Sequence, residues 1–392
     1  MWRLVRQVHL YLGLALSLLL FVFSLTGGAL VYKEAYWRLV YPELRVTAPV
    51  PSAREHAAAI AAAHREFGAA LRSVKLPEPG VAAYHLYLED GEAFLSGRGH
   101  RVIDRWRPSE RVMSLLFDLH AHLMAGETGE RTGGVVSLLG AVLAVTGLVL
   151  WWPARRQFAI RHLLPLGVSR RGFLVWHRDL GVVASPIVLV LLLTGSGLVF
   201  YGTAGKLLNG MFGDAPANVA AAPETSSGPA AAIADAALIE KVEAEFPDAR
   251  LVFYYPPRDG ATFNGFRLKQ PCELHPNGRS YVYVDAGGAV IAKTDACALR
   301  PGERLLHTLY PLHAGKTDSG VYKFVAFLGA LALAALSLSG SLAYTRKLFR
   351  RRRPRSKSAV TSGSRGSARR GGGRAAAGRR SISGWTSVGS PR

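Results

Sequence analysis

Two stretches of the chain align without a gap, and each carries one histidine ahead of a long apolar run. In both, the histidine precedes a glycine by four residues and a Thr-Gly step by seventeen. The matching residues are His9, Gly13, Thr26 and Gly27 in the first stretch and His177, Gly181, Thr194 and Gly195 in the second. Four residues make about one helical turn, so each glycine shares a face with its histidine and leaves space beside the imidazole. The pattern predicts paired axial ligands for a haem inside a helical bundle.

A second pair of histidines repeats in another register. His120 precedes a Thr-Gly step and His313 precedes a Ser-Gly step, and the distance from histidine to glycine is twenty-seven residues in both. The chain therefore reads as two copies of one unit, each made of an apolar run, a hydrophilic segment and a second apolar run. We expect the Thr-Gly and Ser-Gly steps themselves to be close-packing points between helices.

Four apolar windows are long enough to cross a hydrocarbon core, which needs roughly 20 helical residues. They run approximately over residues 10–32, 134–152, 180–201 and 322–344. Span histidines aside, no Asp, Glu or Lys lies in the middle of a window, which disfavours a proton-coupled transporter. The chain is expected to be an integral membrane protein that retains its first apolar run.

Basic residues set the expected orientation. The connection over residues 154–178 holds six arginines and no acid, and the tail from Arg346 holds fifteen Lys or Arg and no acid. Together they equal the formal net charge of +21, so the basic composition reports topology and does not call for a nucleic-acid partner. Both segments, and both termini, are expected in the cytoplasm, which makes this a multi-pass protein of a bacterial inner membrane.

The two remaining hydrophilic segments then face the periplasm, and each reads as a small α+β module. Ser52 could cap a helix that runs to Phe67, and the alternating run over residues 81–88 with a turn at 89–91 suggests a hairpin. The second segment repeats this order, with a helix over 231–246 and strands over 250–255, 263–269 and 280–284. Residues 214–229 read as a linker, and 350–392 as a disordered tail that could contact anionic lipid.

The predicted fold class is an α-helical membrane protein, with four transmembrane helices in a bundle and two periplasmic α+β modules. The expected transmembrane helices are 1–32, 134–153, 180–202 and 321–345, the modules are 33–133 and 203–320, the cytoplasmic loop is 154–179, and the cytoplasmic tail is 346–392.

Topology sorts the histidines into two haem sites. His9 and His177 lie at the cytoplasmic ends of their spans and are the expected ligands of an inner haem, while His120 and His313 are the expected ligands of an outer haem. His122 and His307 could be the outer ligands instead, or could act beside them. No Cys-x-x-Cys-His motif is present, so both haems would be of the noncovalent b type.

The other chemistry-bearing residues give weaker signals. Cys272 and Cys297 lie in one periplasmic segment and could form a disulfide or stay free. Six histidines show no matching and are expected to be ordinary surface residues: His56, His64, His85, His100, His162 and His275. No Gly-x-Gly-x-x-Gly between a strand and a helix supports a nicotinamide or flavin site, so electrons must arrive from another carrier.

These motifs together resemble the PepSY-associated transmembrane family, whose members are often labelled iron-regulated membrane proteins. The resemblance covers residues 1 to about 350 and rests on these segments: Val8–Leu14 with Thr26-Gly27, Leu119-His120 with Gly126 and Gly129, Trp176–Gly181 with Thr194-Gly195, and Leu312–Gly315. It implies four spans, two periplasmic PepSY modules and an association with siderophore uptake. Within the family the chain is most similar to FoxB-type inner-membrane ferri-siderophore reductases with two b haems.

The leading hypothesis is a reductase that passes electrons from an unidentified cytoplasmic or membrane donor, through both haems, to a ferri-siderophore in the periplasm, so that Fe(II) is released. Trp106, Phe253, Tyr254 and Tyr255 are aromatic residues available to cradle the chelate. One alternative is a non-enzymatic PepSY membrane protein that binds or regulates a periplasmic partner. The other is a transporter of a siderophore or metal.

Overall fold

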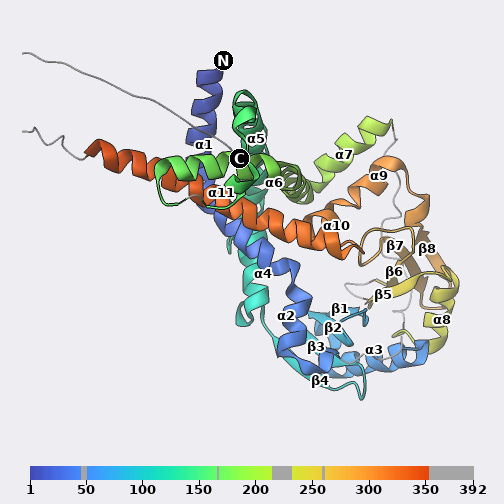
Figure 1. Cartoon of the computed structure of the whole chain (residues 1–392). Helices are drawn as coiled ribbons and strands as arrows, with labels where there is room; N and C mark the ends of the chain where they lie inside the picture. The colour runs from blue at the N-terminus through green and yellow to red at the C-terminus, as the bar shows by residue number, and fades with distance from the viewer. Residues whose placement is uncertain (46–50, 166, 214–231, 258–260, 353–392) are drawn as a thin grey trace, which may run out of the picture. The chain divides into compact units, whose positions relative to one another are not determined.

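A computed structural model describes residues 1–392 except for 46–50, 166, 214–231, 258–260 and 353–392. The predicted linker over 214–229 and all of the tail beyond residue 352 lie outside the described residues. Among the residues that are described, four helices are long and apolar enough to cross a membrane. They are α1 (Trp2–Val31), α5 (Gly126–Trp151), α6 (Arg170–Val199) and α11 (Gly320–Arg352), labelled in Figure 1.

Two of these helices begin earlier than the sequence predicts. Helix α5 starts at Gly126 instead of residue 134, and α6 starts at Arg170 instead of residue 180. An apolar window marks only the part of a helix that matches the hydrocarbon core, whereas the backbone hydrogen bonds continue into polar residues on either side. The polar stretch 126–133 is therefore helical and continuous with the second span.

Short helices flank the spans. They are α2 (Lys33–Val40), α4 (Val112–His122), α7 (Tyr201–Phe212), α9 (Pro301–Leu306) and α10 (Leu309–Ala314), with 3₁₀ turns at Pro42–Arg45, Gly68–Ala70, Pro108–Glu110, Trp152–Gln157, Ile160–Leu163 and Ala296–Ala298. Helix α4 leads into α5, and α10 ends at Gly315, whose φ of 65° suits a residue without a Cβ. Helix α4 carries the outer candidates His120 and His122, and α10 carries His313.

The two hydrophilic segments share a single antiparallel sheet of eight strands. The strands are β1 (Leu71–Lys75), β2 (Ala83–Leu88), β3 (Glu92–Ser96), β4 (Val102–Trp106), β5 (Arg250–Tyr255), β6 (Phe263–Lys269), β7 (Ser280–Asp285) and β8 (Val290–Thr294). Their order is β4-β3-β2-β1-β5-β6-β7-β8, so β1 of the first segment pairs with β5 of the second. The expectation of two separate modules is thus corrected, because each half supplies an edge strand that the other half covers.

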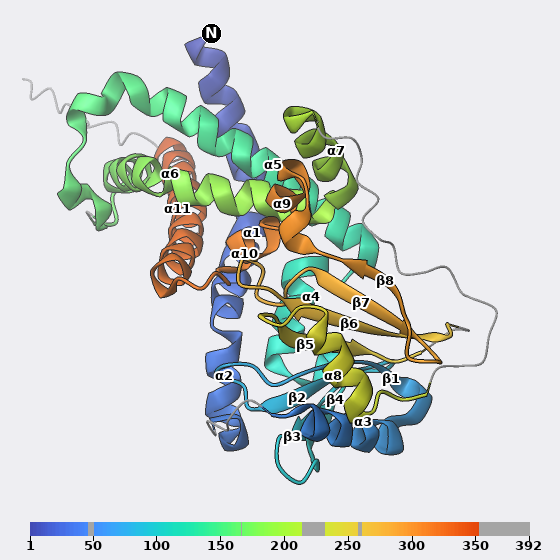
Figure 2. The same ribbon diagram turned by 90° about the vertical axis from the view of Figure 1, so that its right-hand side faces the viewer.

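One face of this sheet is covered by α3 (Ala53–Phe67) and α8 (Ala236–Ala244), as Figure 2 shows. Ser52 caps α3 in a reciprocal arrangement with Glu55, as the sequence predicts. Side chains of both helices and of both sheet halves form one apolar core, in which Tyr84, Tyr254 and Phe266 are fully buried. A common core of this kind makes the two halves one folding unit.

The spans have their own apolar core. Its buried members are Leu16, Leu20, Val136, Ala141, Ala184, Val188 and Leu192, from α1, α5 and α6, and Leu333 of α11 packs against them. These residues lie in the middle thirds of their helices, except Leu192, which lies a little further along α6. The centre of the bundle is therefore apolar.

The shared sheet predicts a cross-link between the two segments. Lys75 and Phe253 are paired across β1 and β5, and side chains paired in this way have Cβ atoms about 4.5–5.5 Å apart. Cysteines at both positions should form a disulfide on mild oxidation, detected by mass spectrometry of the digested protein. Cysteines at Lys75 and Tyr281, which are three strand spacings or about 14 Å apart, should not. Equal cross-linking of the two variants would contradict the single sheet.

Candidate functional site

The four matched histidines all lie in the same kind of surrounding, which we call the histidine seat. A seat consists of a Thr-Gly or Ser-Gly step on a span, together with a nearby backbone carbonyl. His120 and His313 occupy the seats of α1 and α6, and His9 and His177 occupy those of α5 and α11. The steps interpreted from the sequence as helix-packing points therefore serve as receptors for imidazoles.

The seat of His120 is formed by the end of α1. Its Nδ1 lies 3.1 Å from the carbonyl oxygen of Phe23 and 3.1 Å from Oγ1 of Thr26. A Cβ at Gly27 would lie 2.7 Å from Cε1 of His120, so the imidazole fits only because this residue is glycine. The Thr26 hydroxyl itself donates to the carbonyl of Val22, 2.8 Å away.

The seat of His313 on α6 has the same construction. Its Nδ1 lies 2.9 Å from the carbonyl oxygen of Leu191 and 3.4 Å from Oγ1 of Thr194. A Cβ at Gly195 would lie 2.8 Å from Cε1 of the imidazole. The Thr194 hydroxyl donates to the carbonyl of Val190. The two outer histidines are thus held by identical chemistry in the two copies of the repeat.

The inner histidines occupy looser versions of the seat. Nδ1 of His9 lies 2.9 Å from Oγ1 of Thr146 on α5, and a Cβ at Gly147 would lie 3.3 Å from its ring. Nδ1 of His177 lies 3.0 Å from the carbonyl of Leu336 and 3.1 Å from Oγ of Ser339 on α11. A Cβ at Gly340 would lie 3.4 Å from this ring.

The seat determines which ring nitrogen carries the proton. A backbone carbonyl can only accept, and the Thr and Ser hydroxyls donate elsewhere, so Nδ1 of each imidazole has to be the donor. A neutral imidazole has one proton, which leaves the Nε2 lone pair free. Among the described residues, Nε2 of these four histidines has no hydrogen-bond partner. Histidines that bind metals characteristically donate the other ring N–H to a carbonyl or a similar acceptor in this way.

The four imidazoles form two pairs. The ring centroids of His9 and His177 are 6.2 Å apart, and those of His120 and His313 are 5.9 Å apart. Each pair takes one histidine from each copy of the repeat, whereas each seat lies in the same copy as the histidine it holds. Each copy therefore forms the seats of its own two histidines, and the two copies meet where the imidazoles pair.

The remaining residues predicted for the haem sites make no direct contact with the paired imidazoles. Gly13 and Gly181 do not contact an imidazole; an added Cβ at either would first meet a leucine side chain, 3.8 Å and 3.6 Å away. His122 turns its Nδ1 to Asp118, one helical turn back, at 3.0 Å. His307 lies beside Arg279 and Tyr201 at the end of α9. The geometry thus joins His120 to His313 and leaves His122 and His307 outside that pair.

The expectation that the six unmatched histidines lie on the surface is wrong for three of them. His56, His85 and His275 are each only 4% exposed. His56 bonds the Tyr84 hydroxyl at 3.0 Å, and His85 bonds Glu92 at 2.6 Å. Their partners come from other elements, so the sequence around each histidine gives no sign of burial. His162 is half-buried and bonds Asp179, which is completely buried, at 2.6 Å.

An ion pair ties the spans together near the outer pair. Lys316, three residues after His313, donates to Glu34, which follows the end of α1, and Lys323 lies 3.8 Å from the other carboxylate oxygen. Burial by itself would raise the pKa of Glu34, but the neighbouring Lys316 ammonium outweighs it and holds this pKa below its ordinary value. Spacing along the chain gives no indication of this contact.

Cys272 and Cys297 are joined in a disulfide, with Cα atoms 6.1 Å apart. The bridge ties the turn after β6 to the segment after β8. It lies close to His275, whose ring stacks on Tyr310 of α10 with centroids 5.0 Å apart. The helix that carries His313 therefore contacts the sheet half that the disulfide braces.

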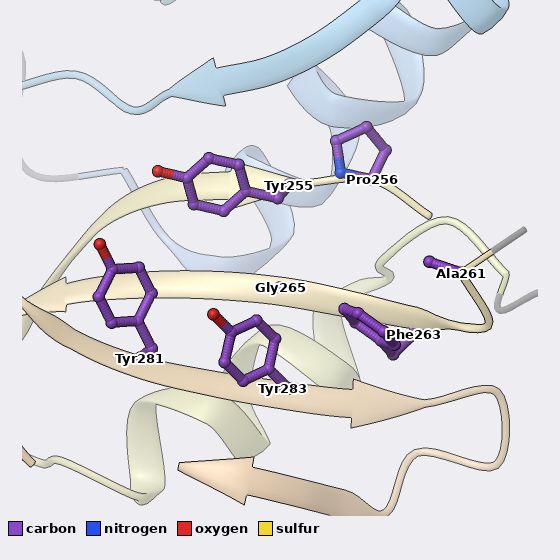
Figure 3. Close-up of a pocket in the computed structure, with 7 residues that line it drawn as sticks. All are labelled: Tyr255, Pro256, Ala261, Phe263, Gly265, Tyr281 and Tyr283. Atoms are coloured by element: carbon purple, nitrogen blue, oxygen red, sulfur yellow. The ribbon is translucent and has the colours of Figure 1, made fainter. Parts of the chain in front are cut away.

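The sheet face opposite α3 and α8 has two adjoining hollows, which we call the tyrosine trough. The first, of about 400 Å³, lies over β5, β6 and β7 and is lined by Tyr255, Phe263, Gly265, Tyr281 and Tyr283 with Pro256 and Ala261, as Figure 3 shows. The second, of about 360 Å³, shares Tyr281 and Tyr283 and adds Tyr201, Arg279, Glu303, Leu306 and His307. Of the aromatic residues expected to cradle a ligand, Tyr255 lines the trough, whereas Trp106 and Tyr254 are buried in cores.

Comparison with known proteins gives one family. The family model of the PepSY-associated TM region matches residues 6–347, which include all four spans and the whole sheet. A search of curated proteins finds no match. Because the model covers most of the chain and four apolar helices accompany it, the protein is a multi-pass membrane protein that belongs to the PepSY-associated transmembrane family.

Proposed function

We propose that the protein is a di-haem reductase that carries electrons across a membrane to a ferric chelate. One haem b would be held by His9 with His177 and the other by His120 with His313. The observation that carries this proposal is the state of the four imidazoles, which are paired across the two copies with Nδ1 bonded and Nε2 free.

The number of ligands favours a macrocycle over a bare metal ion. No group of three or more His, Cys, Asp or Glu side chains that could hold a metal occurs in the described part of the chain. Protein sites for zinc use three or four side chains, but each pair here offers two. A haem brings four nitrogens of its own, so one or two protein side chains would be enough to hold its iron.

The distances within the pairs also suit two axial ligands. Bonds between metals and imidazole nitrogens are about 2 Å long, so imidazoles on opposite sides of one metal have centroids roughly 6 Å apart. The centroids of the two pairs are 6.2 and 5.9 Å apart. A bound haem would supply an iron that exchanges single electrons between Fe(II) and Fe(III).

The bundle places the two pairs at opposite ends of the spans. Seventeen residues of α1 separate His9 from Thr26 of the His120 seat, which is roughly 25 Å of helix. Apolar side chains such as Leu20, Val188 and Leu192 fill the space between and exclude water. The chain would thereby supply two separate redox positions with an apolar interval between them.

Orientation follows from the basic segments. Arginines at 155, 156, 161, 170 and 171 are exposed beside the His9–His177 end, and basic residues concentrate on the cytoplasmic side of bacterial membrane proteins. We place this end in the cytoplasm, where a soluble or membrane-bound electron donor would reach it. The sheet and the His120–His313 end would then face the periplasm.

The substrate we propose is Fe(III) in a siderophore. Hard oxygen ligands hold Fe(III) more tightly than Fe(II). Transfer of one electron to the iron therefore weakens its binding, and Fe(II) is released while the chelator stays intact. The tyrosine trough is the place for such a ligand, because His307 at its end is followed directly by α10, which carries His313.

Pyridine haemochrome analysis of the purified protein should give close to two haems per chain. His9→Ala or His177→Ala should remove the inner haem, and His120→Ala or His313→Ala the outer one, because each deletes a direct bond to iron. His122→Ala and His307→Ala are matched controls and should keep both haems. A haem content near zero in the unmodified protein would contradict the proposed function.

The seat predicts a difference between neighbouring glycines. Gly27→Ala should displace His120 and lower the content of the outer haem, because the new Cβ would lie 2.7 Å from the imidazole. Gly28→Ala is the control, since its Cβ would lie 3.5 Å from Ala330, an ordinary contact. Haem content and the reduced spectrum measure the effect. Equal behaviour of the two variants would show that Gly27 does not seat the ligand.

Dithionite-reduced protein, freed of excess reductant, should be reoxidised by a ferric siderophore with release of about two Fe(II) per chain, one for each stored electron. Stopped-flow absorbance follows the haem bands, and a colorimetric Fe(II) chelator counts the product. A chain with two haems whose reduced bands persist with every ferric chelate would remain a haem protein, but it would not be this reductase.

A further inference from the structure

The tyrosine trough has an aromatic wall and an open floor. The rings of Tyr281 and Tyr283 are stacked with an interplanar angle of 5°, and Phe263 meets Tyr283 edge-on with centroids 5.6 Å apart. Between the strands that carry Tyr255 and Tyr283 lies Gly265, which has no side chain to fill the space. In Figure 3 the three tyrosine hydroxyls of this wall point in the same general direction. Such a surface suits flat aromatic groups with polar edges.

Two arginines beside this wall have no acidic partner. Neither Arg267 nor Arg279 forms an ion pair with a carboxylate in the described part of the chain. The Arg267 guanidinium lies over Tyr281, 5.5 Å from the ring centroid, and donates to the carbonyl of Gly278. Nε of Arg279 is buried without a hydrogen-bond partner. Positive charge that is partly removed from water and unpaired favours an anion.

Two other titratable side chains, Glu303 and His307, line the second hollow beside Arg279. Glu303 is buried and already interacts within the protein. Burial, with the nearby Arg279 and Arg267, lowers the pKa of His307 to about 4, so its imidazole is neutral at pH 7. A neutral imidazole can donate a hydrogen bond to a phenol-type oxygen or accept one from a phenol-type hydroxyl. The hollow thus combines aromatic rings, the cation of Arg279 and the neutral imidazole of His307, with Arg267 beside the aromatic wall.

We infer that the tyrosine trough selects ferric chelates that are both anionic and aromatic, of the catecholate or phenolate class, over neutral or cationic hydroxamate chelates. The inference rests on the proposed function for the identity of the ligand as a ferric chelate. The aromatic wall stacks on the catechol rings, and Arg279 bonds the oxyanion edge. Contacts continue to the outer pair, because Arg267 lies 3.5 Å from His275, which stacks on Tyr310 of the helix that carries His313.

Gallium(III) chelates test this selectivity without any electron transfer, since Ga(III) resembles Fe(III) in size and is not reduced. Binding of a Ga(III) tris-catecholate and of a Ga(III) trihydroxamate to the purified full chain is measured by calorimetry. The catecholate should bind at least about tenfold more tightly, and Arg279→Gln should weaken it by about tenfold, the usual effect of losing one charged hydrogen bond. Hydroxamate binding should hardly change.

Arg105→Gln is the matched control, an exposed arginine on β4 that lies outside the trough, and it should leave both affinities unchanged. Equal affinities for the two chelates, or an Arg279→Gln variant that binds catecholate normally, would overturn the selectivity. The two proposals fail separately. If the chain binds catecholate but contains no haem, the reductase proposal is wrong and the binding site stands. If the chain contains two haems but shows no preference for catecholate, the selectivity is wrong and the reductase proposal stands.

Discussion

The bond from Nδ1 of a buried imidazole to a backbone carbonyl is the interaction on which the arrangement of the bundle depends. A buried imidazole has to satisfy its N–H, and the seat offers only acceptors to it. The hydroxyl beside the carbonyl narrows the orientation of the ring, and the adjacent glycine leaves room for it, with only 2.7 Å between a Cβ at Gly27 and His120. One local motif therefore fixes position, tautomer and the free nitrogen together. Its fourfold repetition sets four imidazoles in equivalent states.

Duplication of the unit is what turns four seats into two sites. A single copy holds two imidazoles at opposite ends of its helices, and each imidazole is one half of a pair. The second copy supplies the other halves, at 6.2 Å for His9 and His177 and 5.9 Å for His120 and His313. The sheet is duplicated in the same way, because the edge strand β1 of the first half pairs with the edge strand β5 of the second half. Both the bundle and the sheet are thus complete only when the two copies meet.

Much of this could be predicted from the sequence, because equal spacing along helices places residues at equal depth. The spans, the cap of α3 at Ser52 and the strands after residue 250 followed from periodicity and local signals. Contacts between distant elements did not. Tertiary packing, which produces no regular spacing in the sequence, determines these contacts. Examples are the pairing of β1 with β5, the burial of His85 against Glu92 and the contact of Lys316 with Glu34. The hydroxyl of Thr26 was visible as part of a repeat, but its bond to His120 was not.

Electron paramagnetic resonance of the oxidised protein tests the central claim most directly, because it reports the coordination of each ferric ion. Two imidazoles that held the iron of one proposed haem would give a low-spin centre. We predict two low-spin ferric signals of about equal intensity per chain, with no substantial high-spin signal. A dominant high-spin signal would mean that iron has one protein ligand or none at each site, and would contradict the paired histidine seats.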